Sequence, residues 1–191
     1  MSTQTIKDQN FDTERPLFKL NDAVVTNCEF HTGESAFKEA RNFSAIDCRM
    51  IGKYPFWHST NTKIKSTLFG DNCRAAIWYS MQIDMADCTV LGTKILRDCE
   101  DVRIHNTSFV SEETLWECRD VTISDSSFRG DYLLLHASDV EISNIKLEGK
   151  YSFQYCKNIV IRDSILNTKD PFWNSENITV YDSIIDGAYP G

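Results

Sequence analysis

Two carboxylates, Asp98 and Glu117, stand 19 residues apart in this chain, and His136 follows at the same interval. Arg97 directly precedes Asp98. If this spacing brings the side chains together, the two carboxyls raise the pKa of one member of the pair, which turns like groups into an acid and a base. Paired carboxylates are typical of glycoside hydrolysis. One hypothesis is therefore a carbohydrate-active enzyme that uses Asp98 and Glu117, with His136 and Arg97 as further catalytic candidates.

Aromatic side chains recur beside these residues, because all four tryptophans share one position of the same spacing and histidines and tyrosines follow them. The ligand-binding candidates in these two columns are Trp57, His58, Trp78, Tyr79, Arg97, Trp116, Tyr155 and Trp173. Aromatic faces suit sugar rings, and an exposed apolar patch of roughly a few hundred Å² usually marks an interaction site. The columns predict a surface that binds a glycan or a protein. The alternative is an aromatic ladder that only stabilises an outer sheet by cross-strand pairing.

An internal repeat must position these residues. Asp, Asn or Gln recurs at nine anchor positions whose separations are 20, 19, 21 and then 19 five times. The anchors are Asp22, Asn42, Asn61, Gln82, Asp101, Asp120, Asp139, Asn158 and Asn177. A period held over this length predicts a solenoid, in which each repeat stacks on its neighbours and equivalent residues lie above one another.

The hydrophobic pattern inside each repeat indicates strands. Positions one, three and eight after the anchor and five before it are apolar in every repeat, apart from Thr62. Alternation with period two and β-branched residues are typical of strands, and no segment has a helical period long enough for a crossover helix. We expect an all-β fold, a right-handed parallel β-helix solenoid of about nine coils of ~19 residues with three short strands per coil. The six-residue repeat usual in left-handed forms is absent.

Two further columns are polar. The anchors, and the residues five positions after them, are mostly Asn and Asp, which suit bends and can form hydrogen-bonded ladders. Because these columns occur in every coil, we interpret them as structural and expect no metal site and no cofactor. One domain, 1–191, is expected, with residues 1–16 as an N-terminal cap region and an incomplete C-terminal coil. That coil fits either a truncated gene or an end-to-end or edge-mediated homo-oligomer.

Composition limits the partners. The formal net charge is −8, which argues against nucleic acid, and no apolar run is long enough to span a membrane. The first residues lack the apolar region of a signal peptide, so a cytoplasmic protein is expected. The seven cysteines then predict reduced thiols. Six fall in inward columns, and Cys73, in the one bend with extra residues, is expected to be the exposed thiol.

Several segments are distinctive: Glu34–Asn42, Tyr54–Ser59, Arg74–Tyr79, Thr114–Cys118, Gly130–Tyr132, Tyr151–Phe153 and Asp170–Ser175. Together they resemble an uncharacterised bacterial family of pectin-lyase-like right-handed β-helix proteins, classed only as a domain of unknown function. The resemblance implies the fold from about Ile6 to Gly191 and supplies no catalytic residues. No Asp cluster with a basic residue typical of polysaccharide lyases is present. We therefore favour a binding module for a glycan or protein partner, with the carbohydrate-active enzyme and a purely structural solenoid as alternatives.

Overall fold

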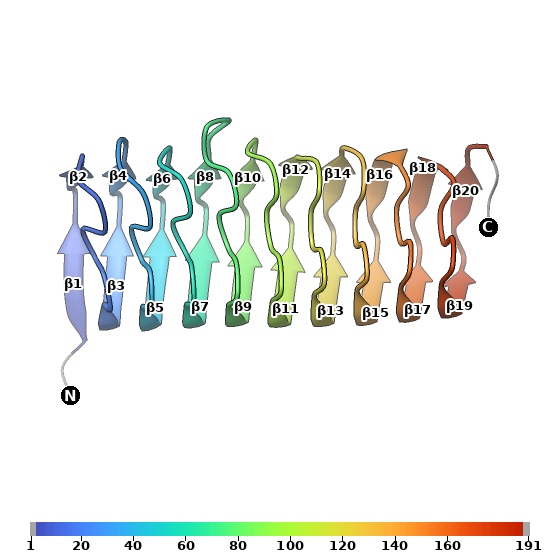
Figure 1. The fold of residues 1–191 in the computed structure, drawn as a ribbon, viewed down its shortest axis with the longest axis horizontal. Coiled ribbons are helices and arrows are strands. Elements are labelled where there is room, and N and C mark those ends of the chain that lie inside the picture. The colour runs from blue at the N-terminus through green and yellow to red at the C-terminus, as the bar shows by residue number, and fades with distance from the viewer. Residues whose placement is uncertain (1–2, 189–191) are drawn as a thin grey trace.

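The computed structural model describes residues 3–188, and these form a solenoid built from two parallel ten-stranded sheets (Figure 1). Sheet A contains β1 (Gln4–Lys7), β3 (Asn21–Thr26), β5 (Arg41–Ile46), β7 (Thr60–Lys65), β9 (Met81–Ala86), β11 (Glu100–His105), β13 (Arg119–Ser124), β15 (Ser138–Ser143), β17 (Lys157–Arg162) and β19 (Glu176–Tyr181). Sheet B contains β2 (Asn10–Phe11), β4 (Glu29–Phe30), β6 (Arg49–Met50), β8 (Leu68–Phe69), β10 (Thr89–Val90), β12 (Ser108–Val110), β14 (Ser127–Arg129), β16 (Lys146–Lys150), β18 (Ile165–Lys169) and β20 (Ile184–Asp186). The described residues hold no helix that could cross a membrane.

The strands pair in the register that the repeat predicts. Val102 lies beside Val121, and Val121 beside Val140, so that like residues stack along the solenoid. Because each strand bonds only to the equivalent strands of the two neighbouring turns, the fold grows in one direction. The all-β parallel solenoid with a spacing of about 19 residues is confirmed.

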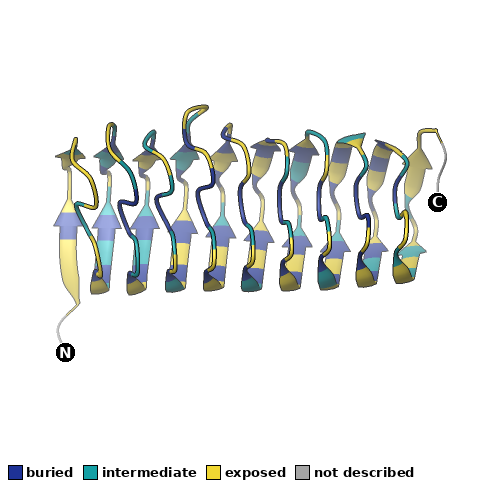
Figure 2. Cartoon of the chain, in the orientation of Figure 1, coloured by how far each residue is buried: buried dark blue, intermediate teal, exposed yellow. Residues whose placement is uncertain are grey.

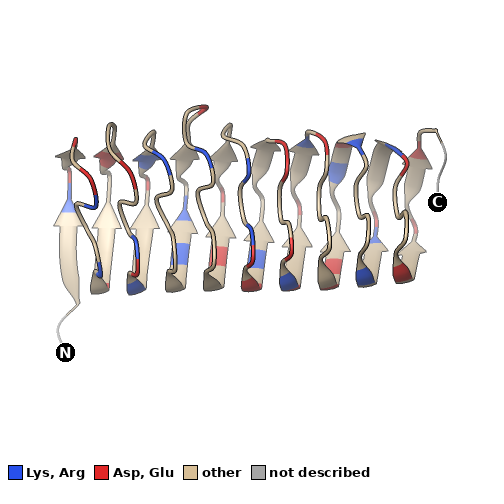
Figure 3. Cartoon of the chain, viewed as in Figure 1, with Lys and Arg blue, Asp and Glu red and all other residues tan. Residues whose placement is uncertain are grey.

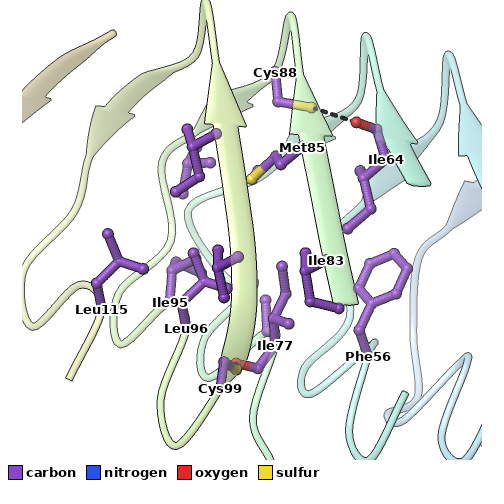
Figure 4. Close-up of a cluster of buried hydrophobic side chains, with 14 of the residues drawn as sticks. Phe56, Ile64, Ile77, Ile83, Met85, Cys88, Ile95, Leu96, Cys99 and Leu115 are labelled. Carbon is purple, nitrogen blue, oxygen red and sulfur yellow. Dashed lines mark hydrogen bonds between the residues drawn. The ribbon is translucent and has the colours of Figure 1, made fainter. Parts of the chain in front are cut away.

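The inward columns form one continuous core, seen in Figure 2 as buried bands that recur from turn to turn until the last, where β19 and β20 have no buried residue. Phe37 stacks on Phe56 with ring centroids 4.9 Å apart, and Phe109 stacks on Phe128 at 4.7 Å. Figure 4 shows the aliphatic part of this core around Ile77 and Ile83. Burying each such side chain stabilises the fold by about 1.5–3 kcal/mol. The core therefore accounts for the four apolar columns of the sequence.

Thr62, the polar exception in these columns, is also buried, and its hydroxyl has no hydrogen-bond partner.

The two polar columns, formed by the anchors and by the residues five positions after them, lie at bends with left-handed backbone, and we call them the Asx columns. All nine anchors have φ between 51° and 57°, and the nine residues five positions later have φ between 44° and 56°. Asn and Asp tolerate this region better than most residues. Their side chains also bond from turn to turn, as Asn106 does to Asp87 at 2.8 Å and Asn144 to Asp125 at 2.7 Å. The structural interpretation of these columns agrees with this geometry.

Two details differ from the sequence expectation. The region 1–16, expected as a cap, contains β1 and β2, so each sheet has ten strands rather than nine. Each full turn also holds two strands rather than three, because the third side is made of turns. Backbone hydrogen bonds, such as that from the His58 amide to the Trp78 carbonyl at 3.0 Å, join neighbouring turns there, but strand-like pairing is limited to isolated bridges of Glu34 with Lys53, Trp78 with Arg97 and Arg97 with Trp116. Left-handed residues seven and three positions before each anchor interrupt the extended backbone there. Residues 189–191, in the expected incomplete coil, lie outside the described residues.

All seven cysteines are free and buried, so the expectation of an exposed Cys73 is wrong. Asp71 and Asn72 of its bend are exposed, but Cys73 itself turns inward, with its amide donating to the carbonyl of Gly70 at 2.9 Å. Its own carbonyl packs so closely on Gly92 that a Cβ there would lie 1.7 Å away. Burial raises the pKa of the Cys73 thiol, and it raises the pKa of Cys48 to about 11.

Candidate functional site

The predicted site residues lie on the third side of the solenoid, which we call the turn side. It consists of the connecting segments that run from sheet B back to sheet A across the front of Figure 1. Residues five and six positions before each anchor point inward, as Leu115 and Thr114 do. The side chains three and four positions before the anchor are left to form the outer surface, and these hold all the candidates.

The tryptophans of the turn side are anchored to the backbone. The indole N–H groups of Trp57, Trp78 and Trp116 each donate to a carbonyl of the following turn, at 2.8, 2.8 and 2.7 Å. The side-chain amide of Gln154 makes the same bond at 3.0 Å. These three tryptophans are half-buried, whereas Trp173 is 60% exposed. The tryptophan column therefore holds neighbouring turns together as well as forming surface.

A stack of aromatic rings and one guanidinium runs along this column. Trp57 stacks on Trp78 with centroids 5.6 Å apart and an interplanar angle of 6°. The guanidinium carbon of Arg97 lies 5.4 Å from the ring centroid of Trp78 and 5.7 Å from that of Trp116. The spacing predicted Arg97 between these two tryptophans, and the structure confirms it. Such cation–π contacts fix the guanidinium in position.

The predicted carboxylate pair is brought together beside Arg97. Nη2 of Arg97 lies 2.9 Å from Oε1 of Glu117, and Nε lies 3.5 Å from Oδ2 of Asp98. Arg97 therefore pairs with both carboxyls. Partial burial and then the Glu117 charge raise the pKa of Asp98, while Arg97 opposes that rise.

The surroundings of these carboxylates bear on the hypothesis of glycoside hydrolysis. Glycosidase carboxyls stand about 5–5.5 Å apart in retaining enzymes and about 6.5–9.5 Å apart in inverting ones, because the scissile bond must fit between them. In this structure the carboxyls of Asp98 and Glu117 are both paired with the Arg97 guanidinium. His136 lies one turn beyond Glu117, where its ring stacks on Tyr155. The arrangement is suited to sharing a proton or a cation.

The residues three positions before the anchor form what we call the exposed column. From the third to the eighth repeat its members are His58, Tyr79, Asp98, Glu117, His136 and Tyr155. All six are exposed and have φ between 51° and 57°. Left-handed backbone costs a residue with a Cβ about 1–2 kcal/mol. Since Lys19 and Glu39 in the same column share it, this backbone belongs to the architecture and turns each side chain outward.

Stacked pairs frame the carboxylates in the exposed column. His58 stacks on Tyr79 with centroids 5.2 Å apart, and His136 stacks on Tyr155 at 4.8 Å. A third stack, not included among the predicted site residues, joins Tyr132 and Tyr151 at 5.2 Å. Its signal was present in the sequence, because both tyrosines stand seven positions before their anchors. The turn side thus combines aromatic pairs with a charged centre.

Two shallow grooves follow the Asx columns. One, of about 590 Å³, runs along the anchors Asp101, Asp120 and Asp139, and another, of about 510 Å³, runs along the second column. The Asn158 amide donates to Asp139 at 2.8 Å, as part of a ladder. Within residues 3–188 no three His, Cys, Asp or Glu side chains are arranged to hold a metal ion. These grooves are the outer surface of the ladders.

Comparisons with known proteins identify the family. The profile of one protein family, described as "Protein of unknown function (DUF3737)", matches residues 4–191. No curated protein sequence matches the chain.

Three solved structures illustrate the fold comparison. The pentapeptide repeat protein HetL, involved in heterocyst differentiation regulation in the cyanobacterium Nostoc, is 7% identical, with 96% of this chain and 88% of HetL covered and a TM-score of 0.36. PfbA, a surface adhesin of Streptococcus pneumoniae, is 12% identical over 97% of this chain and 61% of PfbA, with a TM-score of 0.40. The A-module of the Azotobacter vinelandii mannuronan C-5 epimerase AlgE4 is 9% identical over 98% and 78%, with a TM-score of 0.35. At these values the likenesses carry no argument about function.

Proposed function

The chain belongs to the DUF3737 family of proteins of unknown function, and we propose that it is a binding module that docks a protein partner on its turn side. The observation that carries the proposal is the exposed column. Tyr79 and Tyr155 are 45% and 42% exposed, and each is held by a stacked histidine on a backbone fixed by the solenoid. Tyrosine is enriched at the residues that dominate binding energy in protein interfaces. A rigid scaffold also reduces the entropy cost of docking.

A protein partner fits this surface better than a glycan. A sugar ring stacks on a free aromatic face, but Trp78 contacts Trp57 in the turn before it and the Arg97 guanidinium in the turn after it. The indole N–H groups of both tryptophans are also used by backbone carbonyls. The side chains that remain accessible to a ligand are the tyrosines, histidines and carboxylates of the exposed column. Such mixed contacts are typical of a polar protein interface.

Site-specific photo-crosslinking tests the proposal. A benzoylphenylalanine residue replaces Tyr79 or Tyr155, and the matched control carries it at Tyr181, a tyrosine 47% exposed on sheet A. In a lysate of the organism that carries the gene, we expect a discrete crosslinked protein from the first two positions and none from the control. Unlabelled protein should compete, whereas the Tyr79→Ser/Tyr155→Ser variant should not.

Two results would overturn this function. Identical crosslinks at all three positions would mean that the turn side has no special affinity. Equal competition by the wild type and by the Tyr79→Ser/Tyr155→Ser variant would mean that the tyrosines are not the contact. A glycan array probed in parallel tests the alternative ligand. Strong glycan binding without a protein crosslink would mean that the turn side binds a glycan rather than a protein.

A further inference from the structure

The proposed docking surface has a centre whose chemistry specifies its partner, and we infer that Asp98 and Glu117 receive a cationic side chain, an arginine or lysine of a basic protein segment, beside Tyr79 and His136. This inference rests on the proposed function and names the partner class of the same surface. It follows from the order of side chains in the exposed column, from the charge balance around them and from the way Arg97 is already engaged.

The order of the exposed column makes a framed acidic site. Along the solenoid a His–Tyr stack is followed by Asp98 and Glu117, and then by a second His–Tyr stack. Neighbouring turns are about 4.8 Å apart, so Tyr79 and His136 stand about 14 Å from each other with the two shorter carboxylate side chains between them. A cation seated on the carboxyls therefore lies within reach of the Tyr79 ring, where cation–π attraction operates out to about 6 Å.

The local charge leaves these carboxyls in excess. Across segments 94–98, 112–117 and 131–136 the acidic residues are Asp98, Glu112, Glu113, Glu117 and Asp131, and the cations are Lys94 and Arg97. Lys94 is already paired with Glu113 at 2.9 Å. Figure 3 shows red stretches on the front connecting segments beside β12 and β14. A positively charged partner is therefore attracted to this part of the turn side, and a negatively charged one is repelled.

Arg97 does not satisfy the pair. It makes a hydrogen bond to Glu117 at 2.9 Å, but its Nε is buried without a hydrogen-bond partner, and Oδ2 of Asp98 lies 3.5 Å from it. The guanidinium also contacts the rings of Trp78 and Trp116 on either side. Burial and the Glu117 charge raise the pKa of Asp98 even though Arg97 opposes the rise, which agrees with a pair that Arg97 does not fully compensate. An incoming guanidinium supplies both the charge and the missing donors, since its planar fork matches carboxylates.

Peptide binding tests the inference on the whole protein. The probe is a blocked hexapeptide of alternating glycine and arginine, titrated by calorimetry in low salt, with a glycine–glutamate hexapeptide for comparison. Asp98→Asn/Glu117→Gln removes the site, and Asn174 shows that asparagine is accepted in this column. Asp120→Asn/Asp139→Asn is the matched control, because it removes the same charge from the anchor column, where Asn158 and Asn177 already stand.

We expect the arginine peptide to bind the wild type and the control variant within about twofold of each other, and the Asp98→Asn/Glu117→Gln variant to bind at least tenfold more weakly. The glutamate peptide should not bind. Equal losses in both variants, or equal binding of both peptides, would overturn the inference, because the attraction would then come from overall charge. Crosslinks at Tyr79 that persist in the Asp98→Asn/Glu117→Gln variant would leave the docking function standing while rejecting a basic partner.

Discussion

Arg97 contacts both neighbouring tryptophans and the carboxylate pair. Replacing it by lysine distinguishes the contribution of the positive charge from that of the planar guanidinium. Lysine keeps the positive charge but has no planar group to lie between two rings. The structure gives Arg97 two ring contacts, at 5.4 and 5.7 Å, in a half-buried site. At about 0.5–1 kcal/mol for each such contact, Arg97→Lys should lower the free energy of unfolding by roughly 1–2 kcal/mol.

Urea unfolding followed by tryptophan fluorescence measures this change, and calorimetry should show a fall in Tm of about 2–8 °C for a chain of this size. Arg103→Lys is the matched control, because Arg103 pairs with Asp101 at 2.8 Å on the exposed face of sheet A without an aromatic neighbour. That control should stay within about 0.5 kcal/mol of the wild type. If Arg97→Lys changes the free energy of unfolding as little as Arg103→Lys does, the contacts of Arg97 with the two rings contribute nothing to stability and the reasoning fails.

Three other predictions concern the core, the carboxylate pair and the thiols. Thr62→Val should raise the free energy of unfolding by about 1 kcal/mol, measured in urea, because it removes a buried hydroxyl that has no partner; a loss of stability would contradict this. The raised pKa of Asp98 stabilises the folded state at low pH, and this stabilisation is lost as the pH rises through that pKa. Asp98→Asn, which resembles the protonated acid, should therefore gain less than about 1 kcal/mol at pH 7 and nothing near about pH 3, and a gain that grows on acidification would refute the assignment. Because burial raises the pKa of Cys88 to about 11 and that of Cys156 to about 12, a thiol reagent at pH 8 should label the protein only as fast as it unfolds; rapid labelling of the folded protein would show an accessible thiol.

The repeat in the sequence was sufficient to predict most of the fold. In a solenoid each turn contacts only its neighbours, so a residue's surroundings are set by its own column, and the column can be read from the chain. Val102, Val121 and Val140 were expected inside because they share a position, and they pair there. The Asx bends followed from the same logic, because Asn and Asp tolerate left-handed backbone. Even the position of Arg97 between two tryptophans needed only the spacing.

The backbone conformation of the turn side could not be predicted from the sequence and required the tertiary structure. Tyr79, Glu117 and Tyr155 are residue types that carry no signal for left-handed backbone, yet packing of the inward residues imposes it on each of them and removes the expected third strand. Cys73 was misjudged because the path of a longer bend depends on contacts with the next turn, here with Gly92. The sequence by itself determined which residues share a column, since that depends only on the period. The tertiary structure alone decided how two side chains in adjacent turns meet, as when the Arg97 guanidinium pairs with the Glu117 carboxyl, because that depends on local backbone angles and side-chain rotamers.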